Sequence, residues 1–322
     1  MIKNKNIAIA GGAGFIGTSL VEQLLPENNF IVVIDNFNDY YQGKKENLAS
    51  VTKSFKISKD FEIVKGNLIN KTILSNLDYE FDIIFNLAAQ AGVRYSIENA
   101  AEVTKNNIVS ALNILEYALN NDVKKVVYAS SSSVYGNPIY TPCDEVHPKN
   151  PISPYAVSKL CGEIYADYYF REYKLPVTSL RFYTVYGPRG RPDMAIRKFF
   201  NLIFQNKEIS IYGDGSQLRD FTYVSDLVNG LILAGEKAES SGEAFNLGCS
   251  NPISINELIN KMYEISRHPK KVKYIEKQRG DVDVTYSNTN KAKELLNYIP
   301  KVNIYDGLKK TYEWQMKYNS IR

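Results

Sequence analysis

The chain has 322 residues, 44% of them hydrophobic, which is enough to bury the core of one large domain or of two unequal ones. Its 39 basic and 35 acidic residues are mixed along the chain and leave a net charge of +4, which argues against a nucleic-acid-binding arm or a membrane-surface patch. Because no segment approaches the roughly 18 apolar residues of a membrane span and residues 1–30 lack the pattern of a secretory signal, we expect a cytoplasmic protein.

Short apolar runs alternate with longer amphipathic stretches through the first half of the chain. This alternation is typical of a parallel sheet with helices on both faces. We predict strands at residues 6–10, 30–35, 61–65, 81–87, 125–130 and 177–181. We predict helices between them at about residues 14–25, 101–120 and 155–171. The expected fold is α/β, a doubly wound parallel sheet of the Rossmann type.

The rhythm of strands and helices breaks at about residue 185. Segments rich in proline and glycine follow, such as residues 187–192 and 212–215, and they favour a smaller C-terminal α/β region that covers a substrate. We therefore predict a first domain of residues 1–184 and a mainly substrate-binding region of residues 185–322. Parts of residues 225–250 are expected to return to the first domain, because apolar runs resume there.

A glycine-rich loop at residues 11–17 follows the first predicted strand and opens the first predicted helix. Glycines there would let a pyrophosphate approach backbone N–H groups and the positive end of the helix dipole. The second strand ends at Asp35, 18 residues after Gly17, where a carboxylate can accept both hydroxyls of an adenosine ribose. The glycines could instead serve only a tight turn, and Asp35 only a strand end. No arginine follows Asp35 to hold a 2′-phosphate, so we expect the first domain to bind NAD rather than NADP.

A tyrosine and a lysine stand four residues apart at Tyr155 and Lys159, on one face of a helix that Ser153 and Pro154 can start. The lysine charge, together with a positive nicotinamide, is expected to lower the phenol pKa from about 10 toward neutrality, as a general base requires. The pair could also be a solvated helix face, and the serines at 130–133 only a loop. Their place at the carboxyl end of a strand, where open α/β sheets bind ligands, favours the catalytic interpretation.

Several segments of the chain share one family pattern. They are the glycine loop with Asp35, residues 86–91 (NLAAQA), 130–133 (SSSS), 181–188 (RFYTVYGP) and 219–224 (RDFTYV), and the pair Tyr155 and Lys159. Together they resemble the extended short-chain dehydrogenase/reductases that act on nucleotide sugars. In that family the tyrosine deprotonates a sugar 4-hydroxyl while NAD takes the C4 hydride, which gives a 4-keto sugar without a metal. The resemblance also implies that Ser131 hydrogen-bonds the reacting oxygen, so the expected catalytic residues are Tyr155, Lys159 and Ser131.

The residues that we expect to contact NAD come from the glycine loop, the ends of the following strands and the catalytic helix. They are Gly11, Gly14, Phe15, Ile16, Gly17, Asp35, Asn36, Asn67, Leu68, Leu87, Ala88, Ala89, Tyr155 and Lys159. Asn67 stands where the family usually has an Asp that accepts from adenine N6, and an amide oxygen can accept the same bond.

The residues after Ser131 separate the members of the family. Nucleotide-sugar 4,6-dehydratases carry Asp and Glu where this chain has Ser132 and Ser133, so a dehydration would lack its acid. UDP-xylose synthases, which decarboxylate the keto acid, carry Glu at the second of these positions. UDP-galactose 4-epimerases carry Asn where this chain has Thr184. The chain looks most like the UDP-glucuronate 4-epimerases, also in residues 35–41 (DNFNDYY), 90–96 (QAGVRYS) and 189–195 (RGRPDMA).

A uronate substrate would explain these hydroxyl side chains. Oxidation of a glucuronate at C4 gives a β-keto acid that tends to lose CO₂, so an epimerase must hold the carboxylate where the breaking C–C bond cannot align with the carbonyl π system. Our hypothesis is that Ser132, Ser133 and Thr184 hydrogen-bond this carboxylate. Arg191 or Arg94 would supply positive charge, although either could instead lie on the surface or bind phosphate.

Other chemistry-bearing side chains have simpler expectations. Arg219 and Arg279 match family positions that bind the UDP diphosphate, a role that suits a bidentate guanidinium, although they could be surface residues. The three cysteines follow no metal-ligand spacing, and we expect no metal site. Both histidines lie in polar loops and are expected to be solvated rather than catalytic.

We therefore predict an NAD-dependent isomerase that epimerises C4 of UDP-glucuronate to give UDP-galacturonate. One alternative is a 4-epimerase of UDP-glucose or UDP-N-acetylglucosamine, which needs no cation near C6. Others are a UDP-glucuronate decarboxylase and an NAD-binding protein without catalysis, which would have no use for Ser131, Tyr155 and Lys159 together. The expected partner is the UDP-sugar, and the resemblance implies a homodimer built from the helices near residues 101–120 and 155–171.

Overall fold

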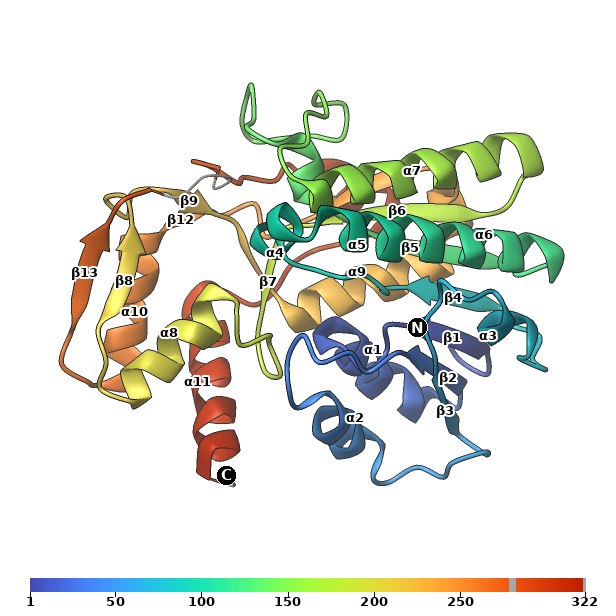
Figure 1. The fold of residues 1–322 in the computed structure, drawn as a ribbon, viewed down its shortest axis with the longest axis horizontal. Helices are drawn as coiled ribbons and strands as arrows, with labels where there is room; N and C mark the ends of the chain where they lie inside the picture. Colours follow the sequence, from blue (N-terminus) through green and yellow to red (C-terminus); the bar gives the residue numbers. More distant parts are fainter. Residues whose placement is uncertain (278–281, 321–322) are drawn as a thin grey trace.

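A computed structural model of the protein describes residues 1–277 and 282–320. Its centre is a seven-stranded sheet in the order β11-β6-β5-β4-β1-β2-β3, in which every pairing is parallel (Figure 1). Its strands are β1 (Asn6–Ala10), β2 (Phe30–Asp35), β3 (Phe61–Lys65), β4 (Ile83–Asn86), β5 (Lys125–Ser131), β6 (Val177–Phe182) and β11 (Ala244–Leu247). The predicted Rossmann-type sheet is confirmed, and all six predicted strands are present.

The helices flank this sheet or form the C-terminal part of the molecule. In chain order they are α1 (Phe15–Leu24), α2 (Lys44–Thr52), α3 (Thr72–Ser75), α4 (Val93–Glu98), α5 (Ala100–Thr104), α6 (Ser110–Asn120), α7 (Pro154–Tyr173), α8 (Ala195–Phe204), α9 (Val224–Glu236), α10 (Ile255–Ser266) and α11 (Ile304–Ser320). No helix in the described part of the chain is long and apolar enough to cross a membrane.

Alternate residues of the strands face opposite sides of the sheet, because the side-chain period of a strand is two. In β1, Ile7 and Ile9 belong to one hydrophobic cluster that also contains the apolar faces of α1 and α9. Ala8 and Ala10 belong to a second cluster, which they share with α6 and α7. Figure 1 shows α6 and α7 on one side of the sheet and α1 on the other. The sheet is therefore covered on both faces, and its strand ends remain free for a ligand.

The helix that we predicted at residues 101–120 is interrupted. It consists of α5, a π-helical turn at Lys105–Val109, and α6. Within the π turn, the Asn107 side chain accepts a hydrogen bond from the Gln90 backbone N–H at 2.7 Å and donates to the Ser158 hydroxyl at 2.9 Å. π turns inside α-helices are often found at functional sites. Here the turn ties the loop after β4 to the helix that carries Tyr155.

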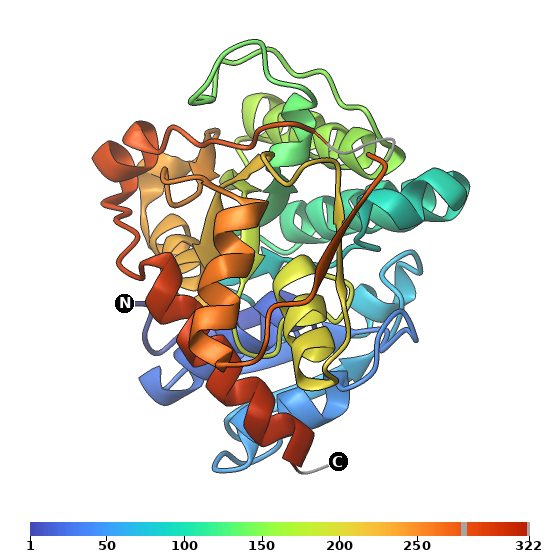
Figure 2. The same cartoon turned by 90° about the vertical axis from the view of Figure 1, so that its left-hand side faces the viewer.

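The C-terminal region forms a set of short strand pairs and also contributes a strand and a helix to the main sheet and its cover. Its short strands pair as β7 (Thr184–Tyr186) with β10 (Phe221–Tyr223), β9 (Leu218–Arg219) with β12 (Ile253–Ser254), and β8 (Ile209–Tyr212) with β13 (Val272–Ile275). Figure 2 shows α8, α10 and α11 gathered on the side that these strands occupy. By contrast, β11 pairs with β6 in the main sheet, and α9 packs against α1 and β5.

The expectation that both histidines are solvated is wrong for His147. Its side chain is 1% exposed, and its Nε2 accepts a hydrogen bond from the Ile139 backbone N–H at 3.0 Å. The ring packs against Tyr135 and Tyr140. His147 thus holds the loop between β5 and α7 together.

Candidate active site

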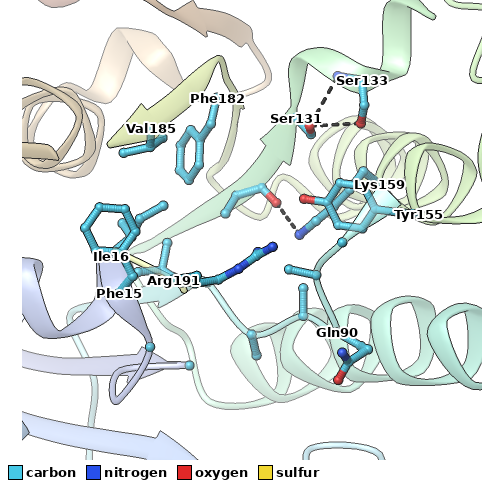
Figure 3. A pocket seen from close by; sticks show the side chains of 18 of the residues that line it. Phe15, Ile16, Gln90, Ser131, Ser133, Tyr155, Lys159, Phe182, Val185 and Arg191 are labelled. Carbon is cyan, nitrogen blue, oxygen red and sulfur yellow. Dashed lines mark hydrogen bonds between the residues drawn. The ribbon is translucent and has the colours of Figure 1, made fainter. Parts of the chain in front are cut away.

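A cavity of about 480 Å³ opens at the carboxyl ends of the central strands. It lies at the end of β1, whose neighbours in the sheet are β4 and β2. The order of the strands along the chain reverses at this point, and open α/β sheets bind ligands there. Every residue that we expected to contact NAD lines it. Thr184, Arg191 and Arg219 close it from the C-terminal side. Figure 3 shows the Arg191 side chain extending toward Tyr155 and Lys159.

The glycine loop has no room for side chains where it meets the sheet. Gly11 has a φ of +75°, and a Cβ there would lie 2.8 Å from the backbone nitrogen of Ala88. A Cβ on Gly17 would collide with the carbonyl oxygen of Gly11. Gly14, the residue before α1, is less crowded, since a Cβ there would have its closest neighbour at 3.2 Å. The loop therefore packs tightly against the backbone that follows β4. It leaves the N-terminus of α1 facing the cavity, as the binding of a diphosphate requires.

Asp35 lies at the end of β2 with its carboxylate turned to the loop. It accepts hydrogen bonds from the backbone N–H of Ala13 at 3.1 Å and of Phe37 at 2.8 Å. Burial raises the pKa of Asp35, which the N–H of Phe37, the charge of Lys44 and the N–H of Ala13 oppose. Each carboxylate oxygen keeps lone pairs for a further donor. Asp35 therefore keeps acceptor capacity for further donors, and its contact with ribose hydroxyls stays a prediction.

Ser153 begins the helix that carries the catalytic pair. Its hydroxyl accepts a hydrogen bond from the Ala156 N–H at 3.2 Å, and Pro154 takes the first helical position. Tyr155 and Lys159 then follow one turn apart, and both line the cavity. The Lys159 ammonium donates to the Ala129 carbonyl of β5 at 2.7 Å.

Ser131 ends β5 opposite this helix. Its hydroxyl accepts hydrogen bonds from the N–H of Ser133 at 3.2 Å and from the Ser133 hydroxyl at 2.9 Å. Figure 3 shows Ser131 and Ser133 at the end of the cavity where Tyr155 lies. The structure therefore brings the three expected catalytic residues and the serines after β5 to one place.

The electrostatics of Tyr155 differ from our expectation. Burial raises its pKa, and the charge of Arg191 and a hydrogen bond with Ser131 oppose this increase. We expected Lys159 to supply the positive charge, but its ammonium lies 5.9 Å from the centre of the Tyr155 ring and is held by Ala129. Burial also lowers the pKa of Lys159 to about 8, which the charge of Glu163 partly offsets. The charge of Arg191 thus favours the phenolate of Tyr155.

A buried ion pair lies behind Lys159. The Arg181 guanidinium of β6 donates to Glu163 of α7 from Nη2 at 2.7 Å and from Nε at 3.0 and 3.2 Å. The side chains are only 3% and 8% exposed. The Ser130 hydroxyl also donates a hydrogen bond to Glu163, and Arg181 donates one to the Tyr135 hydroxyl. This network fixes α7, and with it the catalytic pair, against β5 and β6.

Most, but not all, of the predicted substrate-binding residues line the cavity. Ser132, Ser133, Thr184, Arg191 and Arg219 all line the cavity. Arg94 is not among the lining residues, because its guanidinium lies over the ring of Tyr212, 4.8 Å from the ring centre. Arg191 is therefore the better placed of the two arginines proposed for a sugar carboxylate. Arg279 lies outside the described residues.

The lining residues that the sequence analysis missed as site residues include Asn38, Tyr40, Lys44 and Gln90. Asn38 donates to the Gln90 side-chain oxygen at 3.0 Å, and Lys44 donates to the Asn38 carbonyl at 2.8 Å. Asn38, Tyr40 and Gln90 belong to segments that carried the family resemblance, whereas Lys44 lies outside them. Neither periodicity nor spacing marked them.

Comparison with known proteins places the chain among nucleotide-sugar enzymes. A family model described as GDP-mannose 4,6 dehydratase matches residues 8–311. A UDP-glucuronate 4-epimerase from Thermodesulfobacterium geofontis is 37% identical over 95% of this chain and 94% of its own length. The structure of UDP-glucuronic acid 4-epimerase from Bacillus cereus, in complex with UDP-glucuronic acid and NAD, superposes with a TM-score of 0.89 at 31% identity and covers 97% of this chain and 99% of its own. UDP-glucose 4-epimerase from Thermotoga maritima with UDP-glucose gives 0.90 at 33% identity, with 98% and 99% covered.

Proposed function

The chain belongs to the GDP-mannose 4,6-dehydratase family of extended short-chain dehydrogenase/reductases, and on that premise we propose that it is an NAD-dependent 4-epimerase of UDP-glucuronate. One observation carries the choice of substrate: the Arg191 guanidinium reaches toward Tyr155 in the cavity that Thr184, Ser132 and Ser133 also line. Arginine with neutral hydroxyl donors suits a carboxylate, whereas a neutral hydroxymethyl group needs no cation.

The fit for NAD rests on the glycine cradle and Asp35. Gly14 and α1 would face the diphosphate, and Asp35 would accept from the adenosine ribose. When bound, NAD would accept a hydride from C4 of the sugar and return it. In this proposal, residues 1–184 with β11 and α9 bind NAD, and the rest of residues 185–322 mainly bind the UDP-sugar through groups such as Arg219.

The acid–base work belongs to Tyr155 in this proposal. Its phenolate takes the proton of the 4-hydroxyl, while Ser131 hydrogen-bonds the same oxygen. After the 4-keto sugar has presented its other face, Tyr155 returns the proton. Arg191 and the positive charge of a bound nicotinamide would both counter the effect of burial on the Tyr155 pKa.

The carboxylate site would decide between epimerisation and loss of CO₂. A β-keto acid loses CO₂ when its C–C bond to the carboxylate stands parallel to the carbonyl π system. Donors from Thr184 on one side and Ser132 and Ser133 on another would fix the carboxylate out of that alignment. No carboxylate side chain stands at positions 132 and 133 to act as the acid of a dehydration.

Incubation with three substrates tests this function. We expect UDP-glucuronate to give an equilibrium mixture with UDP-galacturonate by ¹H NMR, without CO₂ and without added cofactor beyond NAD. UDP-glucose and UDP-N-acetylglucosamine should turn over far more slowly. The runner-up, a hexose 4-epimerase, is suggested by the similar fold likeness to the Thermotoga maritima enzyme. Conversion of UDP-glucose alone would establish that alternative instead, and release of CO₂ would establish a decarboxylase.

We also propose a homodimer built on α7 and its neighbours. Ile164 and Tyr168 of α7 are 60% and 42% exposed, and Ile97 of α4 is 49% exposed. Exposed apolar side chains on two helices that pack against each other suit an interface between two copies. Light scattering after size exclusion should give twice the chain mass, and replacement of Ile164 by Glu should shift it toward the monomer. A wild-type protein that elutes as a monomer at micromolar concentration would contradict the dimer.

A further inference from the structure

The side chain of Arg191 is held in place by two residues to which no role has been given so far. Asp193 accepts from Arg191 Nε at 3.0 Å and from Nη2 at 2.7 Å, which fixes the plane of the guanidinium through one edge. In the described part of the chain, Nη1 of Arg191 has no hydrogen-bond partner, and the side chain lines the cavity. The Nη1 edge of the guanidinium is therefore the one available to a ligand.

Tyr40 supports this pair from the opposite domain. Its hydroxyl donates to Oδ2 of Asp193 at 3.1 Å, and its ring lies under the guanidinium, 5.5 Å from the Arg191 Cζ. Tyr40 belongs to the segment between β2 and α2, five residues after Asp35. A hydrogen bond and a cation–π contact thus connect the segment that follows the ribose-binding strand to the arginine.

Tyr40 has little freedom to move. Its ring packs edge-to-face on Tyr95, with 5.2 Å between the ring centres. A Cβ on Gly92, which has a φ of +114°, would lie 2.5 Å from the Tyr40 hydroxyl. The chain therefore uses a glycine where the hydroxyl needs space, and the phenol is fixed where it meets Asp193.

The loop that carries Arg191 is also braced at its base. Arg189, two residues earlier, forms an ion pair with Glu22 of α1, and Arg197 donates to the Gly190 carbonyl. Burial by itself would raise the pKa of Asp193, but the hydrogen bonds and charge of Arg191 hold it below its usual range, so the carboxylate stays ionised. The ion pair leaves Arg191 with a fixed direction and a partly balanced charge.

We propose that Tyr40 and Asp193 are positioning residues that hold Arg191 with one N–H edge toward the substrate carboxylate, and that they thereby determine the preference for a uronate over a neutral hexose. This inference rests on the proposed function. An arginine without this support would have to order four rotatable bonds on each binding event, and a small misplacement of a charged donor has a large effect on turnover.

The test compares two conservative variants on two substrates. Asp193→Asn keeps the shape and loses the charge, and Tyr40→Phe keeps the ring and loses the hydroxyl. We expect Asp193→Asn to raise KM for UDP-glucuronate about tenfold, and Tyr40→Phe to raise it by a smaller factor. For both variants, the KM for UDP-glucose should stay within about twofold of the parental value, however slow its turnover is. The fraction of UDP-glucuronate that is converted to a UDP-pentose should increase.

Glu257→Gln is the matched control, because Glu257 of α10 is half exposed, pairs with Lys261 at 3.4 Å and does not line the cavity, and its kinetics should equal those of the parent. Equal KM increases for both sugars, or no increase with either Tyr40→Phe or Asp193→Asn, would overturn the inference while the parent still epimerises UDP-glucuronate. A parent that does not convert UDP-glucuronate would overturn the proposed function and this inference with it. Because Tyr40→Phe removes one oxygen atom, it supplies a result even if Asp193→Asn does not fold.

Discussion

Replacement of Glu163 by Gln should strongly destabilise the protein. The carboxylate meets three N–H···O contacts of Arg181 within 3.2 Å, and both side chains are more than nine-tenths buried. The amide of Gln would leave the buried guanidinium charge uncompensated and would turn N–H groups toward its donors. Removal of one partner from a buried ion pair costs about 3–5 kcal/mol, and we expect a loss of this size in the free energy of unfolding.

Urea denaturation followed by circular dichroism measures this loss. Glu257→Gln serves as the reference, because its pair with Lys261 on α10 is partly exposed and spaced i to i+4, and its loss should cost only about 0.3–0.5 kcal/mol. A double variant with Met at positions 163 and 181 should recover much of the stability, since apolar groups of similar volume often replace a buried pair without cost. A Glu163→Gln variant within about 1 kcal/mol of the parent would refute the reasoning that this network anchors α7.

Three further predictions concern the cavity. Arg191→Met removes a charge that opposes the effect of burial on Tyr155, so the pKa of the phenol should rise and the acid limb of the kcat/KM profile should move to higher pH. The kcat/KM for UDP-glucuronate should fall about 10- to 100-fold, the equivalent of about 1.5–3 kcal/mol for a charged hydrogen bond. An acid limb at the parental pH would contradict the role of Arg191 in the pKa of Tyr155. Thr184→Ala should release a detectable UDP-pentose from UDP-glucuronate by NMR, whereas unchanged epimerisation without pentose would count against a role in holding the carboxylate. Gly17→Ala should abolish NAD binding in calorimetry, because a Cβ would collide with Gly11, and parental affinity would disprove the need for this close approach.

Local patterns accounted for most of the fold. The period-two alternation of β1 separates Ile7 and Ile9 from Ala8 and Ala10, and the structure places the two pairs in different clusters. The glycine loop was also predictable, because a strand, a glycine run and a helix in succession dictate a close backbone approach. The same holds for Ser153, whose side chain caps α7 as its position before Pro154 indicates.

Interactions between distant segments could not be predicted in this way. The sequence suggested Lys159 as the cation for Tyr155 because it lies one turn away, but it did not indicate this role for Arg191, which tertiary packing brings from a loop 36 residues later in the chain. Tyr40 and Asp193 are 153 residues apart, and no local pattern connects them. His147 looked polar in sequence, yet the loop folds around its ring and buries it.

The π turn at Lys105–Val109 illustrates a third limit. Its residues have ordinary helical propensity, so periodicity predicted one unbroken helix. The irregularity accompanies the hydrogen bonds of Asn107 to the loop after β4, which are contacts with another part of the chain. Such a distortion becomes visible only when the partner segment is placed.

The most direct measurement of the central claim is the turnover of UDP-glucuronate by a Tyr155→Phe variant that retains NAD. If the phenol of Tyr155 exchanges the proton of the 4-hydroxyl, kcat should fall about 10²- to 10⁴-fold, with the unfolding temperature close to that of the parent. Turnover at the parental rate would show that another group performs the proton transfer and would contradict the account.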